Sequence, residues 1–402
     1  MTKQTTQPTR IAMVASQAPP AYGGAGTQAL NLARRLVALS FEVDLLTQNQ
    51  LLAARSDNID GVSIRRAPGE RIARLLPRRI AQIFRTATYT IWLSWLLARG
   101  RYRVFHVHGN YWFALVPAVL SRVLRVPVVL KVTRLGEDDA QTVRDKRIAG
   151  IRLGSIYSLP MRWASVVIAL NDEIASRHAD AFPDVRLLRV PNGVDDQAFA
   201  FSEHARVAMR KRLAVPVDAI VYLFVGYLAP HKGTAELLEA WKRIAPVNSD
   251  AWLVLVGPSS GFYRELSEDV AAAGLALNAS RVLMLDQVEV SAMPAIYAAA
   301  DVFVLPTQAE GMPNSLLEAL ASGLPSVVSS APGVSEVVAG ARSATTLPTV
   351  SADALSAALV HAVRGSDDRA SKLPRRFRLD EVAEAYGNLY GSLIARNRKD
   401  AA

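Results

Sequence analysis

The sequence predicts an α/β fold of two Rossmann-like domains with parallel sheets, because one pattern appears twice in a chain of 402 residues. An apolar run at residues 11–16 leads into a glycine loop and then into a helical pattern that ends near residue 39. Strand, glycine loop and helix in this order are typical of a nucleotide-binding half. The order restarts at residues 219–241, where the turn contains Lys232 and Gly233. The length allows each domain a core of its own.

The composition indicates a globular protein and excludes several kinds of chemistry. Half of the residues are hydrophobic, a fifth are charged, and there is no cysteine. A disulfide framework, a thiolate zinc site and a cysteine nucleophile are therefore excluded. Residues 1–16 show no sustained apolar core of a signal peptide, and no stretch reaches the ~18 apolar residues of a spanning helix. We therefore expect a cytoplasmic protein.

Positive charge is concentrated at residues 65–103, which contain ten arginines and one acid, Glu70, whereas the net charge of the whole chain is +10. Arginines recur there at helical spacing opposite apolar residues, and Pro77 divides the stretch or begins its second helix. A basic amphipathic helix is typical of contact with anionic membranes, so we expect peripheral attachment to the inner face of the cell membrane. The alternative is a core-packed helix with a solvated arginine face. Nucleic acid is not expected as a partner, because no aromatic-interleaved basic platform appears.

The stretch that begins at residue 102 gives a strand that ends in His106-Val107-His108-Gly109. Alternation along a strand places His106 and His108 on one face, and open α/β sheets bind ligands at the carboxyl ends of their strands. A metal site of two histidines would lack an obvious third ligand nearby. Acids follow the next strand at residues 137–139, where solvation is the commoner role, and we expect no metal there.

The most informative stretch, residues 310–330, predicts a loop, a short helix and a buried strand. Pro313 suits the first helical turn and Asn314 is a good N-cap, so both are start signals for the helix, and Gly323 is placed to end it. Glu310 lies in the loop before the helix and Glu318 lies on it.

The start of this helix suits a sugar that carries a diphosphate. Amides at Met312, Asn314 and Ser315 would face an anion at the positive end of the helix dipole, and the two carboxylates would accept hydroxyl groups. The alternative is an ordinary capped helix with a solvated Glu318.

These two carboxylates, spaced E-x7-E within EGMPNSLLEALASGLP, resemble the signature of the family 4 retaining glycosyltransferases, also called glycosyl transferases group 1. Further resemblances follow the family order along the chain: the GG loop, the H-x-H strand, the phrase VPNGVD and the lysine turn. The resemblance implies the GT-B fold, in which two Rossmann-like domains face each other and the C-terminal helix crosses back to the N-terminal domain. It implies an acceptor domain at residues 1–193 joined by helix 376–402, and a donor domain at residues 194–375.

The resemblance also implies a role for each matching residue. Lys232 would neutralise the diphosphate leaving group, Glu310 would contact the sugar near its reacting face, and His108 would orient the sugar from the other domain. Glu318 would bind the ribose hydroxyls. The remaining expected substrate contacts are Gly23, Gly24, Asn192, Tyr227, Met312, Pro313, Asn314, Ser315 and Leu317. No metal or other cofactor is expected, since the nucleotide-sugar is the substrate.

One departure from the family pattern concerns the phosphate grip. The family usually has the sequence G-R-L before the lysine turn, and this chain has Tyr227 in place of the arginine.

The expected activity is hexosyl transfer to a lipid-linked or membrane-associated glycan for the cell envelope or exopolysaccharide. A GT-B epimerase or hydrolase, and a catalytically weak scaffold for membrane or partner proteins, are the alternatives. Donor base, sugar and linkage are not determined by these residues.

Overall fold

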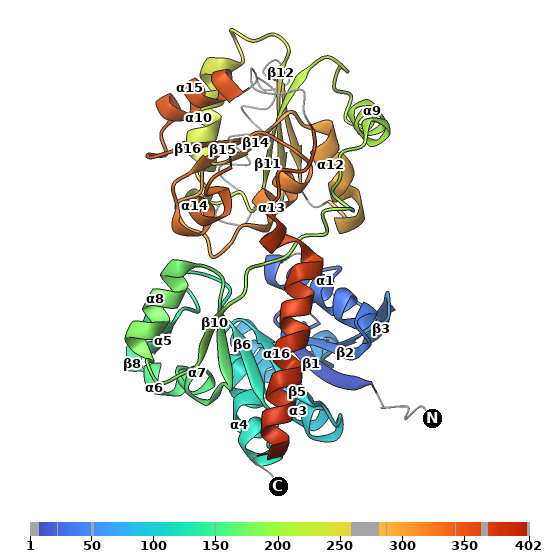
Figure 1. Cartoon of the computed structure of the whole chain (residues 1–402), viewed down its shortest axis with the longest axis vertical. Coiled ribbons are helices and arrows are strands. Elements are labelled where there is room, and N and C mark those ends of the chain that lie inside the picture. Colours follow the sequence, from blue (N-terminus) through green and yellow to red (C-terminus); the bar gives the residue numbers. More distant parts are fainter. Residues whose placement is uncertain are drawn as a thin grey trace. The chain divides into compact units, whose positions relative to one another are not determined.

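The chain folds into two compact units, residues 1–193 with 379–402 and residues 194–378 (Figure 1). A computed structural model describes residues 8–21, 23–49, 52–148, 150–258, 281–286, 288–341, 343–362 and 369–399. The first boundary coincides with the one expected from the sequence. The return into the first unit begins at residue 379 instead of 376, because the Val194 amide donates to Phe377 O at 2.9 Å and ties that segment to the second unit.

The first unit is built on an eight-stranded sheet in the order β10-β9-β6-β5-β1-β2-β4-β3. Its strands are β1 Thr9–Ala15, β2 Phe41–Thr47, β3 Ser56–Ile59, β4 Val62–Arg66, β5 Val104–His108, β6 Val128–Lys131, β9 Val166–Ala169 and β10 Leu187–Arg189. Each neighbouring pair is parallel except β3 with β4. The antiparallel edge strand β3 and a small hairpin, β7 Arg147–Ile148 with β8 Ile151–Arg152, were not expected from the sequence.

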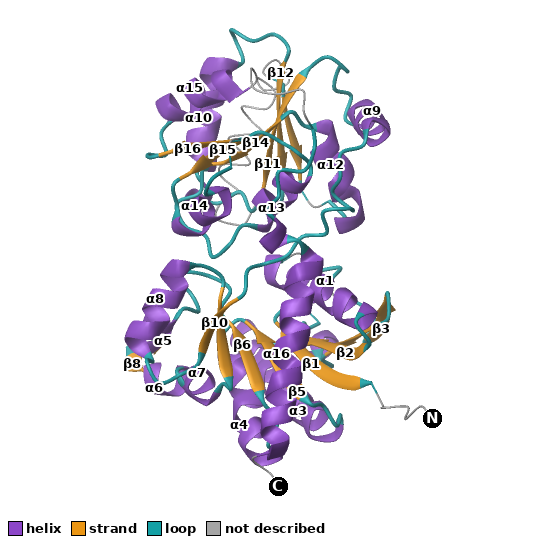
Figure 2. Ribbon diagram, viewed as in Figure 1, coloured by secondary structure: helices purple, strands orange, loops and turns teal. Residues whose placement is uncertain are grey.

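Helices cover both faces of this sheet (Figure 2). They are α1 Gly24–Ala38, α2 Glu70–Ala73, α3 Arg78–Arg99, η1 Trp112–Ala114, α4 Leu115–Leu124, α5 Ala140–Arg144, α6 Gly154–Tyr157, α7 Leu159–Trp163, α8 Asp172–Ala181 and α16 Leu379–Lys399. The apolar strands read as nearly continuous hydrophobic runs because a parallel sheet is buried on both faces.

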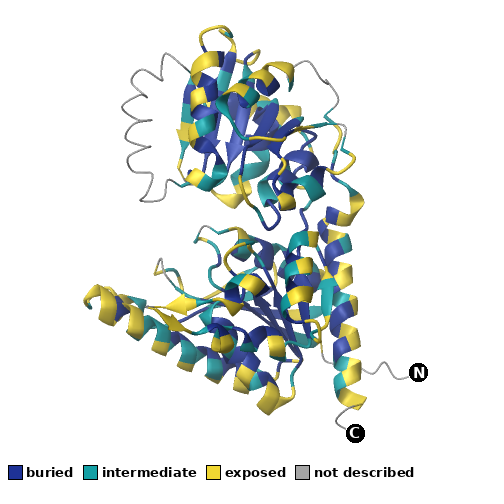
Figure 3. Cartoon of the chain, turned by 90° about the vertical axis from the view of Figure 1, so that its left-hand side faces the viewer, coloured by how far each residue is buried: buried dark blue, intermediate teal, exposed yellow. Residues whose placement is uncertain are grey.

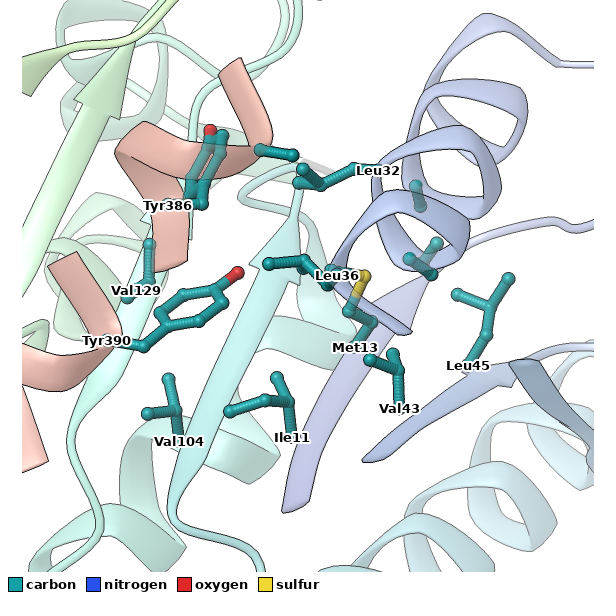
Figure 4. Close-up of a cluster of buried hydrophobic side chains, with 14 of the residues drawn as sticks. Ile11, Met13, Leu32, Leu36, Val43, Leu45, Val104, Val129, Tyr386 and Tyr390 are labelled. Carbon is teal, nitrogen blue, oxygen red and sulfur yellow. The ribbon is translucent and has the colours of Figure 1, made fainter. Parts of the chain in front are cut away.

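The C-terminal helix α16 belongs to the first unit, as the sequence predicted. Its Tyr386 and Tyr390 are fully buried and join a core with Val104 and Val129 of the sheet (Figure 4). Apolar burial of this kind contributes about 1.5–3 kcal/mol for each large side chain. The helix is therefore a structural part of the first unit and helps to hold its sheet.

The second unit is built on a six-stranded parallel sheet in the order β13-β12-β11-β14-β15-β16. Its strands are β11 Ile220–Val225, β12 Ala251–Val256, β13 Val282–Leu285, β14 Val302–Leu305, β15 Ser326–Ser329 and β16 Ala344–Leu347. Its helices are α9 Glu203–Arg212, η2 Pro230–Lys232, α10 Thr234–Ile244, η4 Val290–Ala292, α12 Met293–Ala299, α13 Asn314–Ala321, α14 Pro332–Val338, α15 Ala352–Ala362 and η5 Arg375–Phe377. Because β11 and β14 are neighbours, the loops that follow them meet at one edge of the sheet.

Burial is high in both sheets and low on the outer turns of many helices (Figure 3).

In the basic segment, α3 begins directly after Pro77, as expected, and packs through Tyr89, Leu93 and Leu97. Some apolar residues near its start are exposed, since Leu75 is 86% exposed and Ile83 is 70% exposed, whereas Ala81 is buried. The alternative of a core-packed helix with a solvated arginine face therefore fits the second half of α3, but not Leu75 and Ile83. Among the described residues, no helix has the length and apolar character needed to cross a bilayer.

Candidate functional site

A tight turn places Lys232 at the carboxyl end of β11. Gly233 adopts φ +67° and precedes α10, and a Cβ at this position would lie 2.1 Å from the carbonyl oxygen of Pro306. Glycine is required because it tolerates both this left-handed conformation and the close backbone approach. The turn is thereby held directly against the loop that follows β14.

The loop after β14 carries Glu310 and is joined to the lysine turn by hydrogen bonds. The amide of Gln308 donates to His231 O at 2.7 Å, and the hydroxyl of the buried Thr307 donates to the same oxygen at 3.1 Å. Lys232 Nζ and Glu310 form an ion pair, and each side chain is about 15% exposed. Two residues that are 78 positions apart in sequence therefore form one charged centre.

The helix after Glu310, α13, begins at Asn314 with Pro313 at the capping position and no side-chain cap. The expectation that Asn314 caps the helix is thus wrong by one residue, since Asn314 is already the first helical residue. Gly323 follows the helix with φ +72°, as predicted for a C-terminal glycine. The side chain of Leu317 lies on the buried face of α13 and packs in the core, so only its backbone remains a candidate for substrate contact.

Glu318 lies half-buried on α13 and accepts a hydrogen bond from the hydroxyl of Tyr297 at 2.8 Å. Tyr297 also contacts the backbone oxygen of Ser315 at 3.2 Å. Burial raises the pKa of Glu318 to about 7, although the tyrosine hydrogen bond works in the opposite direction. The Glu318 side chain is therefore partly buried and held by Tyr297 and is not freely solvated. This carboxyl group is held in a fixed position.

Two residues beside this centre were not predicted from the sequence. Tyr297, on α12, orients Glu318 as described. Gly333, near the start of α14, lies so close to the preceding loop that a Cβ would come within 2.6 Å of the backbone oxygen of Glu310. The dipeptide Pro332–Gly333 at a helix start was the signal that could have indicated a close approach of backbone.

Tyr227, which replaces the arginine of the family pattern, is 37% exposed. It follows β11 and Gly226, so its backbone lies at the same sheet edge as the lysine turn. Nothing in its position supplies a positive charge. The cation of the described centre is Lys232.

In the first unit, His108 ends β5 and is 1% exposed. Its ring lies 4.3 Å from that of His106, which confirms that the two share a face. His106 Nδ1 lies 2.6 Å from the hydroxyl of Tyr390 on α16, so His106 supports the structure. Neither ring nitrogen of His108 has a hydrogen-bond partner among the described residues. A buried polar group without a partner is uncommon and suits a ligand contact.

The charge state of His108 follows from its surroundings. Burial lowers its pKa well below the usual value, and the nearby His106 and Lys131 lower it further. The ring is therefore a neutral imidazole that can donate through one nitrogen and accept through the other. Burial also lowers the pKa of Lys131, at the end of β6, to about 7. Lys131 is a further polar residue at this edge that sequence reasoning missed.

The remaining residues predicted in the first unit lie near the start of α1 and at the end of the unit. Gly23 precedes α1 and Gly24 is its first residue. Gln28 on the same helix donates to Gly193 O at 3.0 Å, and the neighbouring Asn192 is buried. The glycine loop and the VPNGVD segment are thus linked across 165 positions.

The acidic loop at residues 137–139 has a structural role. Asp138 is fully buried and accepts hydrogen bonds from the amides of Asn110, Thr133 and Arg134. Asp139 caps α5. Among the described residues, no group of three or more histidines and acids is arranged to hold a metal ion.

The structure therefore brings Lys232, Glu310 and the start of α13 together in the second unit, with Glu318 fixed on α13. It places His108 and the glycine loop in the first unit. Two Rossmann-like units, a C-terminal helix that returns to the first unit and this charged centre define the GT-B class of glycosyltransferases.

Comparisons with known proteins agree on the family. Residues 23–193 match the glycosyl transferase 4-like domain, and residues 206–378 match the glycosyl transferases group 1 domain. The chain belongs to the family 4-like glycosyltransferases.

A curated relative and solved structures of similar fold cover most of the chain. The chain is 27% identical to the lipopolysaccharide core biosynthesis mannosyltransferase LpsB of Rhizobium meliloti, over 88% of this chain and 98% of that one. Sucrose-phosphate synthase from Thermosynechococcus elongatus has a similar fold, with a TM-score of 0.76, 20% identity and coverage of 96% and 100%. Anabaena HepE in complex with UDP-glucose has a TM-score of 0.70, 17% identity and coverage of 95% and 99%.

Proposed function

We propose that this protein transfers a hexose, with retention, from a nucleotide-diphosphate-sugar to a lipid-linked or membrane-associated glycan at the cytoplasmic face of the cell membrane. The Lys232–Glu310 pair beside the start of α13 is the observation that carries the proposal. The relative named as a lipopolysaccharide core mannosyltransferase and the HepE structure named with UDP-glucose support the donor and acceptor classes.

Lys232 is the group proposed to stabilise the leaving diphosphate. Positive charge aimed at the phosphate lowers the barrier to breaking the bond between sugar and phosphate, because negative charge develops there. The start of α13 adds the positive end of its dipole. An arriving diphosphate would compete with Glu310 for Lys232, which would release the Glu310 carboxylate toward the sugar.

Glu318 is proposed to bind the ribose and His108 to orient the transferred sugar. A neutral imidazole can both donate to and accept from sugar hydroxyls, which a protonated ring cannot. Residues 1–193 with the C-terminal helix would bind the acceptor, and residues 194–375 the donor. We propose that no metal ion or other cofactor takes part, and that Lys232 and the start of α13 together stabilise the leaving diphosphate.

Thermal unfolding with a panel of nucleotide diphosphates and nucleotide-sugars tests the function. A ligand that binds only the folded protein stabilises it, by about 2.7 kcal/mol when the free ligand is at 100 times its Kd. This stabilisation raises the melting temperature. We expect one uridine or guanosine nucleotide-sugar to give a clear shift in melting temperature. The same compound with a labelled sugar is expected to transfer the label to a membrane extract. Absence of any shift would favour a scaffold role, and release of free sugar without transfer would favour a hydrolase.

The surface formed by α2 and the start of α3 is proposed to contact an anionic bilayer. Exposed arginines alternate there with exposed apolar residues, which include Ile72, Leu75, Ile80 and Ile83. Basic side chains attract anionic headgroups by about 1 kcal/mol each, and apolar side chains enter the boundary between headgroups and acyl chains. The net charge of +9 over residues 65–103 favours a lipid surface over a neutral partner.

Replacing Leu75 and Ile83 by glutamate is expected to weaken binding to anionic vesicles at least about tenfold, since it removes apolar insertion and adds repulsion. Co-sedimentation with phosphatidylglycerol vesicles measures this, with phosphatidylcholine vesicles for comparison. Val247→Glu is the matched control because Val247 is 76% exposed in the second unit. Equal binding of all variants would contradict the assignment of this surface.

A further inference from the structure

A pocket of about 270 Å³ lies in the first unit, outside the residues assigned above. Residues that directly follow β2 and β4 line one side of it, and the first half of α3 lines another. Strands β2, β4, β1 and β5 are all parallel. The pocket and His108, which ends β5, therefore lie at the carboxyl edge of one sheet, where this kind of fold binds ligands.

An ion pair with two hydrogen bonds lies in the wall of the pocket. Arg85 on α3 holds both oxygens of Glu70 on α2, with distances of 2.8 and 3.0 Å. Burial opposes ionisation of Glu70, but the bonds from Arg85 and Arg74 outweigh it and hold the pKa of Glu70 below its usual value. The charges of Glu70 and Arg85, which both line the pocket, cancel each other. The wall therefore offers directed polar atoms and no net positive charge that would attract a phosphate. Gln82 adds an uncharged amide.

Two buried polar atoms of the pocket lining lack a partner among the described residues. Asn49 donates through Nδ2 to Ala53 O at 2.9 Å, while its Oδ1 is unpaired. Tyr89 is 2% exposed, and its hydroxyl is unpaired as well. Leaving such groups unsatisfied carries a desolvation cost, which a hydroxyl group of a ligand or a water molecule would recover.

Aromatic rings complete the wall. Tyr89 packs edge-on against Trp112, with ring centroids 5.5 Å apart, and both residues line the pocket. A sugar ring has one face of C–H groups, which packs on aromatic surface, and a rim of hydroxyls, which pair with amides and carboxylates. The volume lies just below the range of about 300–1,000 Å³ for drug-sized ligands, so it suits one monosaccharide unit.

We propose that this pocket binds a neutral hexose unit of the acceptor glycan. The proposal rests on the proposed transferase function and adds the acceptor subsite to it. The groups assigned to the donor phosphate lie in the second unit, whereas this pocket belongs wholly to the first. Its ion pair joins α2 and α3, the same helices that present the proposed bilayer surface, so a lipid-linked sugar reaches the pocket from the membrane side.

Saturation-transfer NMR on the full chain tests this, with the methyl glycosides of glucose, galactose, mannose and N-acetylglucosamine as probes. At least one glycoside is expected to bind. Tyr89→Phe removes only the unpaired hydroxyl and Gln82→Ala only the amide, and each is expected to weaken binding roughly 2–10-fold. Gln141→Ala, an exposed position on α5 outside the pocket, should not.

Failure of this proposal can be told apart from failure of the proposed function. No saturation transfer from any glycoside, or equal affinities in Tyr89→Phe, Gln82→Ala and the unaltered chain, would overturn the pocket assignment. The melting-temperature shift by nucleotide-sugar is measured on the same variants and should persist in all of them. Loss of the melting-temperature shift by nucleotide-sugar, with glycoside binding retained, would overturn the donor assignment and leave the pocket assignment intact.

Discussion

Replacing Lys232 by alanine is expected to lower the transfer rate roughly 100–1,000-fold, as is usual when one preorganised group that stabilises developing negative charge is removed. Lys232 forms an ion pair with Glu310 at the end of β11, beside the start of α13. The measurement is the steady-state rate with the nucleotide-sugar that gives the largest melting-temperature shift. Most of the loss should appear in kcat, because the diphosphate charge develops during bond cleavage.

Lys242→Ala is the matched control, since Lys242 is 61% exposed on α10 of the same unit. Melting temperatures show whether each variant stays folded. The double variant Lys232→Ala with Glu310→Gln should lose much less than the product of the two single losses, because each residue acts through the other. Full activity of Lys232→Ala would exclude the proposed leaving-group role.

The second large effect is the dependence of folding stability on pH, to which the carboxyl group of Glu318 contributes. Burial raises the pKa of this carboxyl to about 7 in the folded state, against an ordinary value of 4.5. Between these two values the folded protein retains a proton that the unfolded chain releases. The folded state binds more protons, so the contribution of Glu318 to stability falls as the pH rises through this window and is constant above it.

Glu318→Gln removes this titration and keeps an oxygen that can accept from Tyr297. Its stability relative to the unaltered chain should therefore improve by about 2–3 kcal/mol from pH ~4.5 to pH ~8, which follows from about 1.4 kcal/mol per pKa unit. Urea unfolding at both pH values measures the difference. Glu239→Gln, at an exposed position on α10, should show no such trend. A stability difference that is independent of pH would show that the pKa of Glu318 is the same in the folded and unfolded states.

The sequence by itself determined the order of the main strand–turn–helix units. Apolar runs, glycine turns and the spacing of Glu310 and Glu318 are local features, and local features set local structure. The same reasoning located the turn of Lys232 and the strand that ends at His108, whereas the division of the chain at residue 193 came from the resemblance to the family. The one-residue error at Asn314 arose because helix ends depend on small differences between capping options.

Tertiary structure alone decided which of these residues act together. The pairing of Lys232 with Glu310 requires β11 and β14 to be neighbours in the sheet, which no local pattern reports. The pKa of Glu318 depends on its burial beside Tyr297, and the exposure of Leu75 depends on which face of its segment packs. Such properties arise from contacts between residues far apart in the chain, and those contacts exist only after the sheets have formed.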